Sequence, residues 1–257
     1  MSGAGTLILS IDLELDLEHQ DNRLQQRLDD LRTRLVDLTK AYRVPATWAV
    51  ADPALSVATE SILAADCGHE IAVLGQRAWL GPGCGRARLG RELARRFAGA
   101  RKAGIPVGTL ALRDVDQILD LDLLLDHGIT AIRGPAVDTP RLARKLGTPP
   151  IRFGLWQTPA AVRIPPRTAW WLPAAWVVRH EIKQAIRQQS LAHFEIDAAQ
   201  IVAAPDHSLG LIAATLEFAA AKREAGLLAI ASIGQMAARL LSVRTAAPSR
   251  SILQPAA

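Results

Sequence analysis

The order of apolar and polar residues predicts a strand at the start of the chain that ends in a row of acids. Residues 7–11, Leu-Ile-Leu-Ser-Ile, form an apolar run with a single serine, as in a strand buried in a parallel sheet. Three acids follow at alternate positions, Asp12, Glu14 and Asp16. Alternate residues of an extended strand point to one face, and α/β enzymes place catalytic carboxylates at the carboxyl end of such a strand. The alternative is that these acids only open a loop and cap the helix that follows.

The rest of the chain alternates between predicted strands and predicted helices. Leucines at three- and four-residue steps predict an amphipathic helix over residues 21–42. Further strands are predicted at residues 44–50, 68–74, 107–112, 129–132, 191–196 and 227–232. Further helices are predicted up to about residue 65 and over residues 86–103, 115–127, 176–189, 208–225 and 233–241. Short joins between alternating elements indicate parallel strands with right-handed crossovers, and the absence of a Gly-x-Gly-x-x-Gly turn favours a barrel over a dinucleotide-binding sheet.

Residues 134–175 interrupt this alternation and are rich in proline. A long irregular insertion at a barrel mouth either shapes a binding cleft or covers the core as a loop. The tryptophans in or beside it suit the faces of sugars but are as often part of a core; they are Trp156, Trp170, Trp171 and Trp176. We expect one barrel domain over residues 5–242 and a disordered tail over residues 243–257.

Composition narrows the class of protein. The chain has 257 residues, of which 49% are hydrophobic and 21% charged, so it can bury a sizeable core. Its net charge of +5 arises without a Lys/Arg run or interleaved aromatics, which favours a solvated basic surface over nucleic-acid binding. Cys67 and Cys84 fit unpaired thiols in a reducing compartment. We find no signal segment and no apolar run long enough to span a bilayer, and therefore expect a cytoplasmic protein.

Several short segments resemble, in chain order, the motifs of one enzyme family. They are Ser-Ile-Asp-Leu-Glu at 10–14, Val-Pro-Ala-Thr-Trp-Ala-Val at 44–50, Gly-His-Glu-Ile-Ala at 68–72, Leu-Ala-Leu-Arg-Asp at 110–114, Gly-Ile-Thr-Ala-Ile-Arg-Gly at 128–134 and His-Phe-Glu-Ile-Asp at 193–197. Together they resemble the polysaccharide deacetylases (NodB-homology, carbohydrate esterase family 4) over roughly residues 6–240. The resemblance implies a distorted (β/α)7, TIM-like barrel of the glycoside hydrolase/deacetylase type.

The resemblance also implies metal-assisted hydrolysis of an N-acetyl group on a sugar. In that chemistry an Asp acts as general base, and a second acid with two histidines holds a divalent metal that activates water. The chain departs from the family at the metal positions, where the acid is replaced by Leu13 and the histidines by Leu74 and Ala78. The late histidine is replaced by Asp197. We therefore expect no metal at the usual site, while a divalent metal at a relocated site stays open.

The candidate site residues follow from the strand ends and the motifs. The candidate catalytic residues are Asp12, Glu14, Arg113 and Asp197, and the candidate substrate-binding residues are Trp48, His69, Arg133 and His193. Because parallel strands end at one rim, we expect Asp12 and Arg113 to lie close together, either as the remnant of an active site or as a structural ion pair.

One strand near the end of the chain offers a second constellation. His193, Glu195 and Asp197 alternate and therefore share one face of that strand. If that face points into the barrel, the three groups could bind a hard cation through oxygen or hold an acid and a base with different pKa values. The alternative is a polar strand end with solvated carboxylates.

Three functions remain open at this point. The first is a deacetylase-like hydrolase that acts on C–N bonds of N-acetyl groups with relocated catalytic residues. The second is a catalytically inactive barrel, a pseudoenzyme, that binds a sugar or a protein partner. The third is a structural or regulatory protein. In the first two cases we expect the ligand to be a carbohydrate or another small polar molecule.

Overall fold

The structure is a computed structural model. It describes residues 4–14, 22–81, 83–113, 115, 120–138, 151–152, 154–158, 161–165 and 173–246. The predictions for Asp16, Trp170, Trp171 and the tail beyond residue 246 lie outside these residues.

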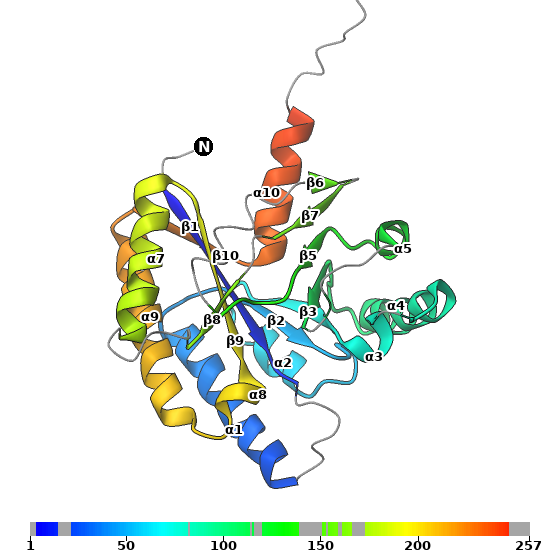
Figure 1. Cartoon of the computed structure of the whole chain (residues 1–257), viewed down its shortest axis with the longest axis horizontal. Coiled ribbons are helices and arrows are strands. Elements are labelled where there is room, and N and C mark those ends of the chain that lie inside the picture. The colour runs from blue at the N-terminus through cyan, green and yellow to red at the C-terminus, as the bar shows by residue number, and fades with distance from the viewer. Residues whose placement is uncertain are drawn as a thin grey trace, which may run out of the picture.

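Ten described strands form one sheet, drawn in Figure 1. They are β1 (Gly5–Asp12), β2 (Thr47–Val50), β3 (Glu70–Gly75), β4 (Thr109–Leu112), β5 (Ala131–Arg133), β6 (Ile151–Arg152), β7 (Leu155–Gln157), β8 (Val162–Ile164), β9 (Leu191–Asp197) and β10 (Leu228–Ala231). Their order is β6-β7-β5-β4-β3-β2-β1-β9-β8, with β10 paired to β1. All described pairs are parallel except β6 with β7. The predicted strand–helix alternation with parallel strands is thereby confirmed.

The sheet closes at one point, where the segment just after β5 meets β8. Val137 forms an isolated parallel bridge with Val162 of β8. The Val137 N–H donates to the Ala161 carbonyl at 2.8 Å, and the Arg163 N–H donates to the Val137 carbonyl at 3.0 Å. The bridge links the β5 side of the sheet to β8, at the other side. The sheet therefore curves into a barrel, and the contact that closes it is very short. The predicted distorted α/β barrel is confirmed.

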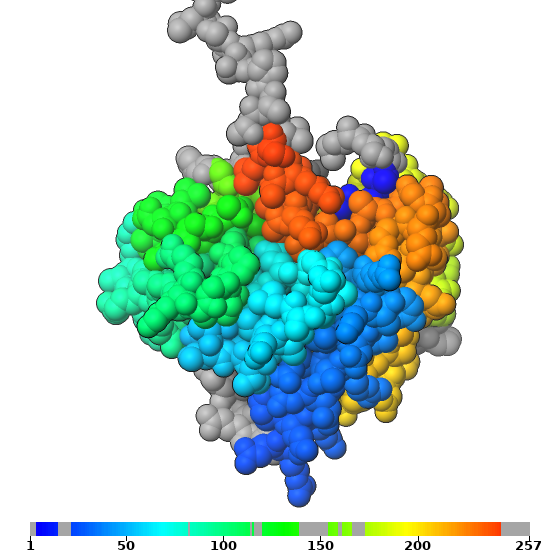
Figure 2. All heavy atoms as spheres, turned by 180° about the vertical axis from the view of Figure 1, so that it is seen from behind, coloured from blue at the N-terminus to red at the C-terminus, as the bar shows by residue number. Residues whose placement is uncertain are grey.

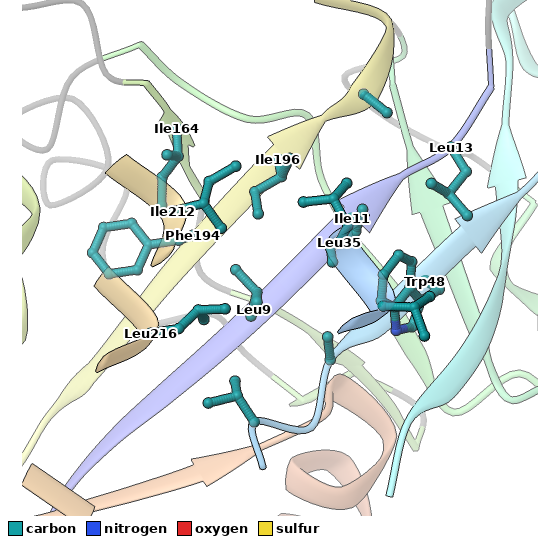
Figure 3. Packing of buried hydrophobic residues seen from close by; sticks show 14 of the residues in the cluster. Leu9, Ile11, Leu13, Leu35, Trp48, Ile164, Phe194, Ile196, Ile212 and Leu216 are labelled. Carbon is teal, nitrogen blue, oxygen red and sulfur yellow. The ribbon is translucent and has the colours of Figure 1, made fainter. Parts of the chain in front are cut away.

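Helices cover the outside of the sheet. They are α1 (Asn22–Ala41), α2 (Ala58–Leu63), α3 (Arg77–Leu80), α4 (Arg86–Lys102), α5 (Leu121–Asp126), α7 (Ala174–Gln188), α8 (Ala198–Ile201), α9 (Pro205–Glu224) and α10 (Ile233–Ala246). The largest core lies between strands and helices, where Leu9 and Ile11 of β1 pack with Leu35 of α1 and with Ile212 of α9 (Figure 3). Since these β1 residues face outward, Ile8, Ser10 and Asp12 face the barrel interior. None of the described helices is both long and apolar enough to cross a membrane.

Helix α10 closes the amino end of the barrel. Its Ile233, Met236 and Ala237 pack against Ile8 of β1 and Trp156 of β7. Figure 2 shows α10 between the green α5 region and the orange α9. Helix α10 continues to residue 246 and is thus longer than the predicted 233–241.

The segment predicted as irregular, residues 134–175, differs most from its prediction. Its described part holds β6, β7 and β8, which have two or three residues each. Strands this short have no measurable hydrophobic period, and the sheet around them determines their conformation.

Candidate functional site

The polar side chains of β1 and β9 meet inside the barrel at the carboxyl ends of these strands, which we call the mouth. Ser10 lies beside Glu195 and Asp12 beside Asp197 in the parallel register of the two strands. All four side chains are buried. The carboxylate-rich inner face expected for β9 is therefore present.

An ion pair between Asp12 and Arg133 crosses the interior of the barrel. Arg133 ends β5, which is separated from β1 by three strands in the sheet order. Its Nη1 and Nη2 donate to Oδ1 and Oδ2 of Asp12 at 2.6 and 2.7 Å. The Arg133 side chain is 0% exposed and that of Asp12 is 1% exposed. Nη1 of Arg133 also lies 3.1 Å from Oε2 of Glu195, so one guanidinium serves two acids.

Arg113 forms a second ion pair at the mouth. Its Nη2 donates to Oδ1 of Asp197 at 2.6 Å, and its Nη1 donates to the backbone carbonyl of Glu14 at 3.0 Å. Asp197 Oδ1 also accepts from the Ala199 N–H at 3.1 Å and caps the short helix α8. The expected pairing of Asp12 with Arg113 is wrong, because the β5 arginine reaches Asp12 across the barrel. Arg113 does lie on the same rim, as expected.

Two further charged residues extend the network outward. Arg163 of β8 donates to Asp138 at 3.0 Å, and its Nε lies 3.7 Å from Oε1 of Glu195. The side chains of Arg163 and Asp138 are 22% and 33% exposed, whereas that of Glu195 is 4% exposed. The network therefore runs from the sealed interior to the solvent. Sequence reasoning missed Arg163 and Asp138, because only the bridge at Val137 brings them together.

Burial raises the pKa values of two acids in this network. Burial raises the pKa of Glu195 to about 7, against the opposing charge of Arg133, and the nearby Asp12 adds to the increase. Burial also raises the pKa of Asp197, although Arg113 lowers it in part. A pKa of about 7 places the titration of Glu195 near neutral pH.

The predicted substrate-binding residues do not all reach the mouth. His193 lies on the inner face, where its Nε2 is 2.5 Å from the Ser10 hydroxyl. His69 precedes β3 and lies at the amino end, where its Nδ1 accepts from the Ala46 N–H at 3.1 Å. Burial lowers the pKa of His69 to about 4. Trp48 points outward into the core (Figure 3). Its ring packs edge to face on the His69 ring, with 5.6 Å between the ring centroids.

The two described tryptophans of the expected sugar platform, Trp156 and Trp176, do not lie together either. Trp156 is buried beside α10, and Trp176 is 55% exposed and stacks on His180 of its own helix α7.

The mouth does not fit the metal that the family resemblance implies. Leu74 is buried in the interior with Ala49, Ala72 and Ala111, while Leu13 packs in the outer core. Neither offers a donor atom, and both oxygens of Asp12 bind Arg133. Across the described ranges, no group of three or more His, Cys, Asp or Glu side chains is placed to hold a metal ion.

Comparisons with known proteins identify the fold. No family model matches the chain, and no curated protein matches it in sequence. Among solved structures, it is similar to a "putative polysaccharide deacetylase" from Mycobacterium smegmatis, with a TM-score of 0.65 and 16% identity over 100% of this chain and 96% of that one. It is also similar to a 4-alpha-glucanotransferase from Thermococcus litoralis, with a TM-score of 0.61 and 12% identity over 92% of this chain and 40% of that one. The protein has a deacetylase-type α/β barrel, and the resemblance of its motifs is confirmed at the level of the fold.

Proposed function

We propose that this protein binds a carbohydrate on a deacetylase-type barrel and carries out no metal-dependent deacetylation. The observation that supports this proposal is the state of Asp12, the position of the general base. Both of its oxygens bind the guanidinium of Arg133, and its side chain is 1% exposed.

A general base must accept a proton from a water molecule within hydrogen-bond reach. The bidentate contact with the guanidinium of Arg133 already places a hydrogen bond on each oxygen of Asp12. The burial of the pair leaves no open edge at which a substrate and its attacking water could meet Asp12. With Leu13, Leu74 and Ala78 in place of the metal ligands, the arrangement supports a structural role for the Asp12–Arg133 pair.

The carbohydrate part of the proposal rests on the two similar structures, whose names refer to a polysaccharide and to a glucan. The partly exposed Arg163 and Asp138 offer both hydrogen-bond donors and acceptors at the outer edge of the mouth. Sugar hydroxyls can bond to groups of both kinds, because each hydroxyl donates one hydrogen bond and accepts others.

Two measurements on the purified protein test this proposal. The first is acetate release from N-acetylated chitooligosaccharides with added zinc or cobalt, for which we expect no release above the buffer rate. The second is calorimetric titration with neutral and N-acetylated oligosaccharides, for which we expect saturable binding of at least one. Metal-dependent acetate release that is lost in Asp12→Asn would contradict the proposal, as would the failure of every sugar to bind.

A second candidate function is metal-independent hydrolysis with Glu195 as the acid or base. Two observations favour it: Glu195, unlike Asp12, lies 3.7 Å from Arg163, which is 22% exposed at the outer edge of the mouth, and the Glu195 pKa of about 7 suits proton transfer near neutral pH. This function predicts hydrolysis of a glycan substrate in the presence of a chelator, with a pH profile that changes slope near that pKa. Loss of this activity in Glu195→Gln, with unchanged sugar binding, would favour it over the first candidate.

A further inference from the structure

Helix α4 concentrates the positive charge of the chain. It carries seven basic residues and one acid, a net charge of +6, whereas the whole chain of 257 residues carries +5. The basic residues are Arg86, Arg88, Arg91, Arg95, Arg96, Arg101 and Lys102. The remainder of the chain is therefore slightly acidic, and the field around the protein attracts anions to this one helix.

Four of these cations form a row along the exposed face of α4, which we call the cation row. The row consists of Arg88, Arg91, Arg95 and Lys102. Their spacings of three, four and seven residues place them on one side of the helix, over a length of about 21 Å. All four are exposed, while Leu93 and Phe97 hold the other side of α4 in the core. Figure 1 shows α4 at the outer edge of the molecule, beside α3 and α5.

Acids near α4 engage only some of its basic residues. Two acids, one just before α5 and one within it, bind Arg86 at the start of α4. Glu92 lies 3.2 Å from Arg95 and also binds Arg96. Asp52 lies 4.0 Å from Arg95, at the limit of an ion pair. These acids therefore neutralise the ends of α4 less than they neutralise its margins.

The other four basic residues form no ion pair with a described residue. They are Arg88, Arg91, Arg101 and Lys102. Burial lowers the pKa of His127, and Arg101 lowers it further while Asp126 raises it, so Arg101 has an acid in its vicinity. The three that remain all belong to the cation row.

This arrangement is unfavourable for the free protein. Arg88 and Arg91 are three residues apart, and Arg91 and Arg95 are four apart, so like charges repel along the row. The first turn of α4 contains no acid and places Arg86 and Arg88 at the positive end of the helix dipole. Natural sequences break such rules mostly at functional sites, and an anion on the row would relieve both conflicts.

The surroundings of the row favour a partner with a single narrow chain. The other exposed residues of this face include Ala87 and Ala98, which offer neither hydrogen bonds for base edges nor rings for base stacking. Asp122 and Asp126 are exposed on the neighbouring α5 and would repel the second strand of a nucleic-acid duplex. Three of the four row residues are arginines, whose planar fork suits carboxylates in particular.

We propose that the cation row of α4 binds a linear acidic polysaccharide. It rests on the proposed function only for the polysaccharide class. The row is separate from the mouth, because it lies on the outside of the barrel whereas the network at the mouth faces the interior.

Fluorescence anisotropy of a labelled oligogalacturonate with the full-length protein tests this proposal. We expect saturable binding that weakens at least about tenfold when the salt concentration rises from about 50 to 200 mM, because salt screens exposed charges. A malto-oligosaccharide of the same length is neutral and should not displace the probe. A DNA duplex should compete more weakly than unlabelled oligogalacturonate.

Two double variants with the same change in charge locate the site. Arg88→Gln/Arg91→Gln removes two charges of the row and should weaken binding at least about tenfold; glutamine has nearly the helix propensity of arginine, so the fold should be retained. Arg179→Gln/Arg187→Gln removes two charges from the exposed face of α7 and should leave binding unchanged. Thermal unfolding of both variants checks that the fold is intact.

Other results overturn the inference. An equal loss of binding in both double variants would show that only net charge matters, and binding insensitive to salt would remove the role of charge. A DNA duplex that binds as tightly as the oligogalacturonate would make the row a nucleic-acid surface. If no oligogalacturonate binds while neutral oligosaccharides do, this inference is wrong and the proposed function stands. If oligogalacturonate binds through the row while no neutral or N-acetylated sugar binds, the proposed function alone is contradicted.

Discussion

The two ends of the barrel each hold a carboxylate, half-buried at the amino end and fully buried at the mouth, and they satisfy it in different ways. At the amino end, Glu70 accepts from the hydroxyls of Thr47 at 2.9 Å and of Thr109, and from the Gly234 N–H at 2.7 Å, which fixes the start of α10. At the mouth, Asp12 is held by the fully buried guanidinium of Arg133. Each hydrogen bond from a neutral donor adds a modest amount to the free energy of unfolding, largely independently of the others. A buried charge, in contrast, is stabilised only while its partner charge is present. The mouth should therefore be the more fragile end.

The largest expected effect comes from breaking the buried ion pair. Asp12→Asn leaves Glu195 as the one remaining ion-pair partner of Arg133 among the described residues and should lower the free energy of unfolding by about 3–5 kcal/mol. Urea denaturation of the variant measures this loss. Because the penalty arises from an unpaired buried charge, the double variant Asp12→Asn/Arg133→Met should recover part of the stability. If Asp12→Asn is nearly as stable as the parent but loses ligand binding, the pair is functional and not structural.

The next effect is a pH dependence of stability that originates at the mouth. The pKa of Glu195 is raised from 4.5 to about 7 in the folded state, so folding favours its protonated form. Its contribution to stability is complete below about pH 4.5 and is lost as the pH rises through about 7, by up to about 3 kcal/mol. When the free energy of unfolding is measured across this pH range, the contribution of Glu195 to its pH dependence should be absent in Glu195→Gln.

His69 at the amino end should make the free energy of unfolding depend on pH in the opposite direction, over nearly the same pH range. It therefore serves as the control. The pKa of His69 is lowered from 6.5 to about 4 by burial, so its contribution is present above pH 6.5 and is lost as the pH falls toward 4. The two slopes partly cancel in the parent protein. Glu195→Gln should expose a loss of stability toward acid, and His69→Gln should expose a loss toward neutral pH. Identical pH profiles of these two variants would contradict the comparison.

A smaller effect is expected at Glu70. Glu70→Gln keeps the shape but turns an amide N–H₂ toward groups that donate, so one of the three contacts is lost. We expect a decrease of about 1–3 kcal/mol in the free energy of unfolding, with little dependence on salt. A loss as large as that of Asp12→Asn would show that the two ends do not differ in this way.

The smallest effect is expected for an ion pair on the surface. Arg34 lies 2.9 Å from Asp206, but the two side chains are 50% and 85% exposed. Arg34→Gln should change the free energy of unfolding by less than about 1 kcal/mol, and added salt should reduce the difference further. This variant sets the scale against which the buried pairs are judged.

The sequence was sufficient to predict the long strands and helices, but not to predict the side-chain contacts across the barrel. Strands β1 and β9 were predictable, β1 from a mostly apolar run that ends in acids at alternate positions and β9 from the alternation of His193, Glu195 and Asp197 with apolar residues. The rim position of Arg113 and Arg133 was predictable from the parallel order. Which of the two pairs with Asp12 was not, because that depends on how far each side chain reaches across the interior, which is set by the curvature of the whole sheet.

His69 illustrates a different limit. The motif resemblance indicated a residue near the site, but His69 lies just before β3 begins, at the opposite end of the barrel from the carboxylates. The predicted strand at residues 68–74 already placed His69 at its start, and the start of a parallel strand lies at the end of the barrel opposite the carboxylates. The short strands β6 to β8 were missed because two or three residues show no period.

The position of β1 has a consequence for the order in which the chain can fold. One edge of β1 pairs with β9 at residues 6–12, and the other pairs with β10 at residues 5–8 and with β2 at residues 10–12. During synthesis, β1 emerges before the other strands of the described sheet and waits for two of its partners, which lie about two hundred residues later in the chain. Contacts of such long range fold slowly, and an unpaired strand edge invites association with other chains. A nascent chain that stops before β9 leaves β1 with β2 as its only neighbour in the described sheet, and such intermediates should depend on chaperones more than the completed barrel does.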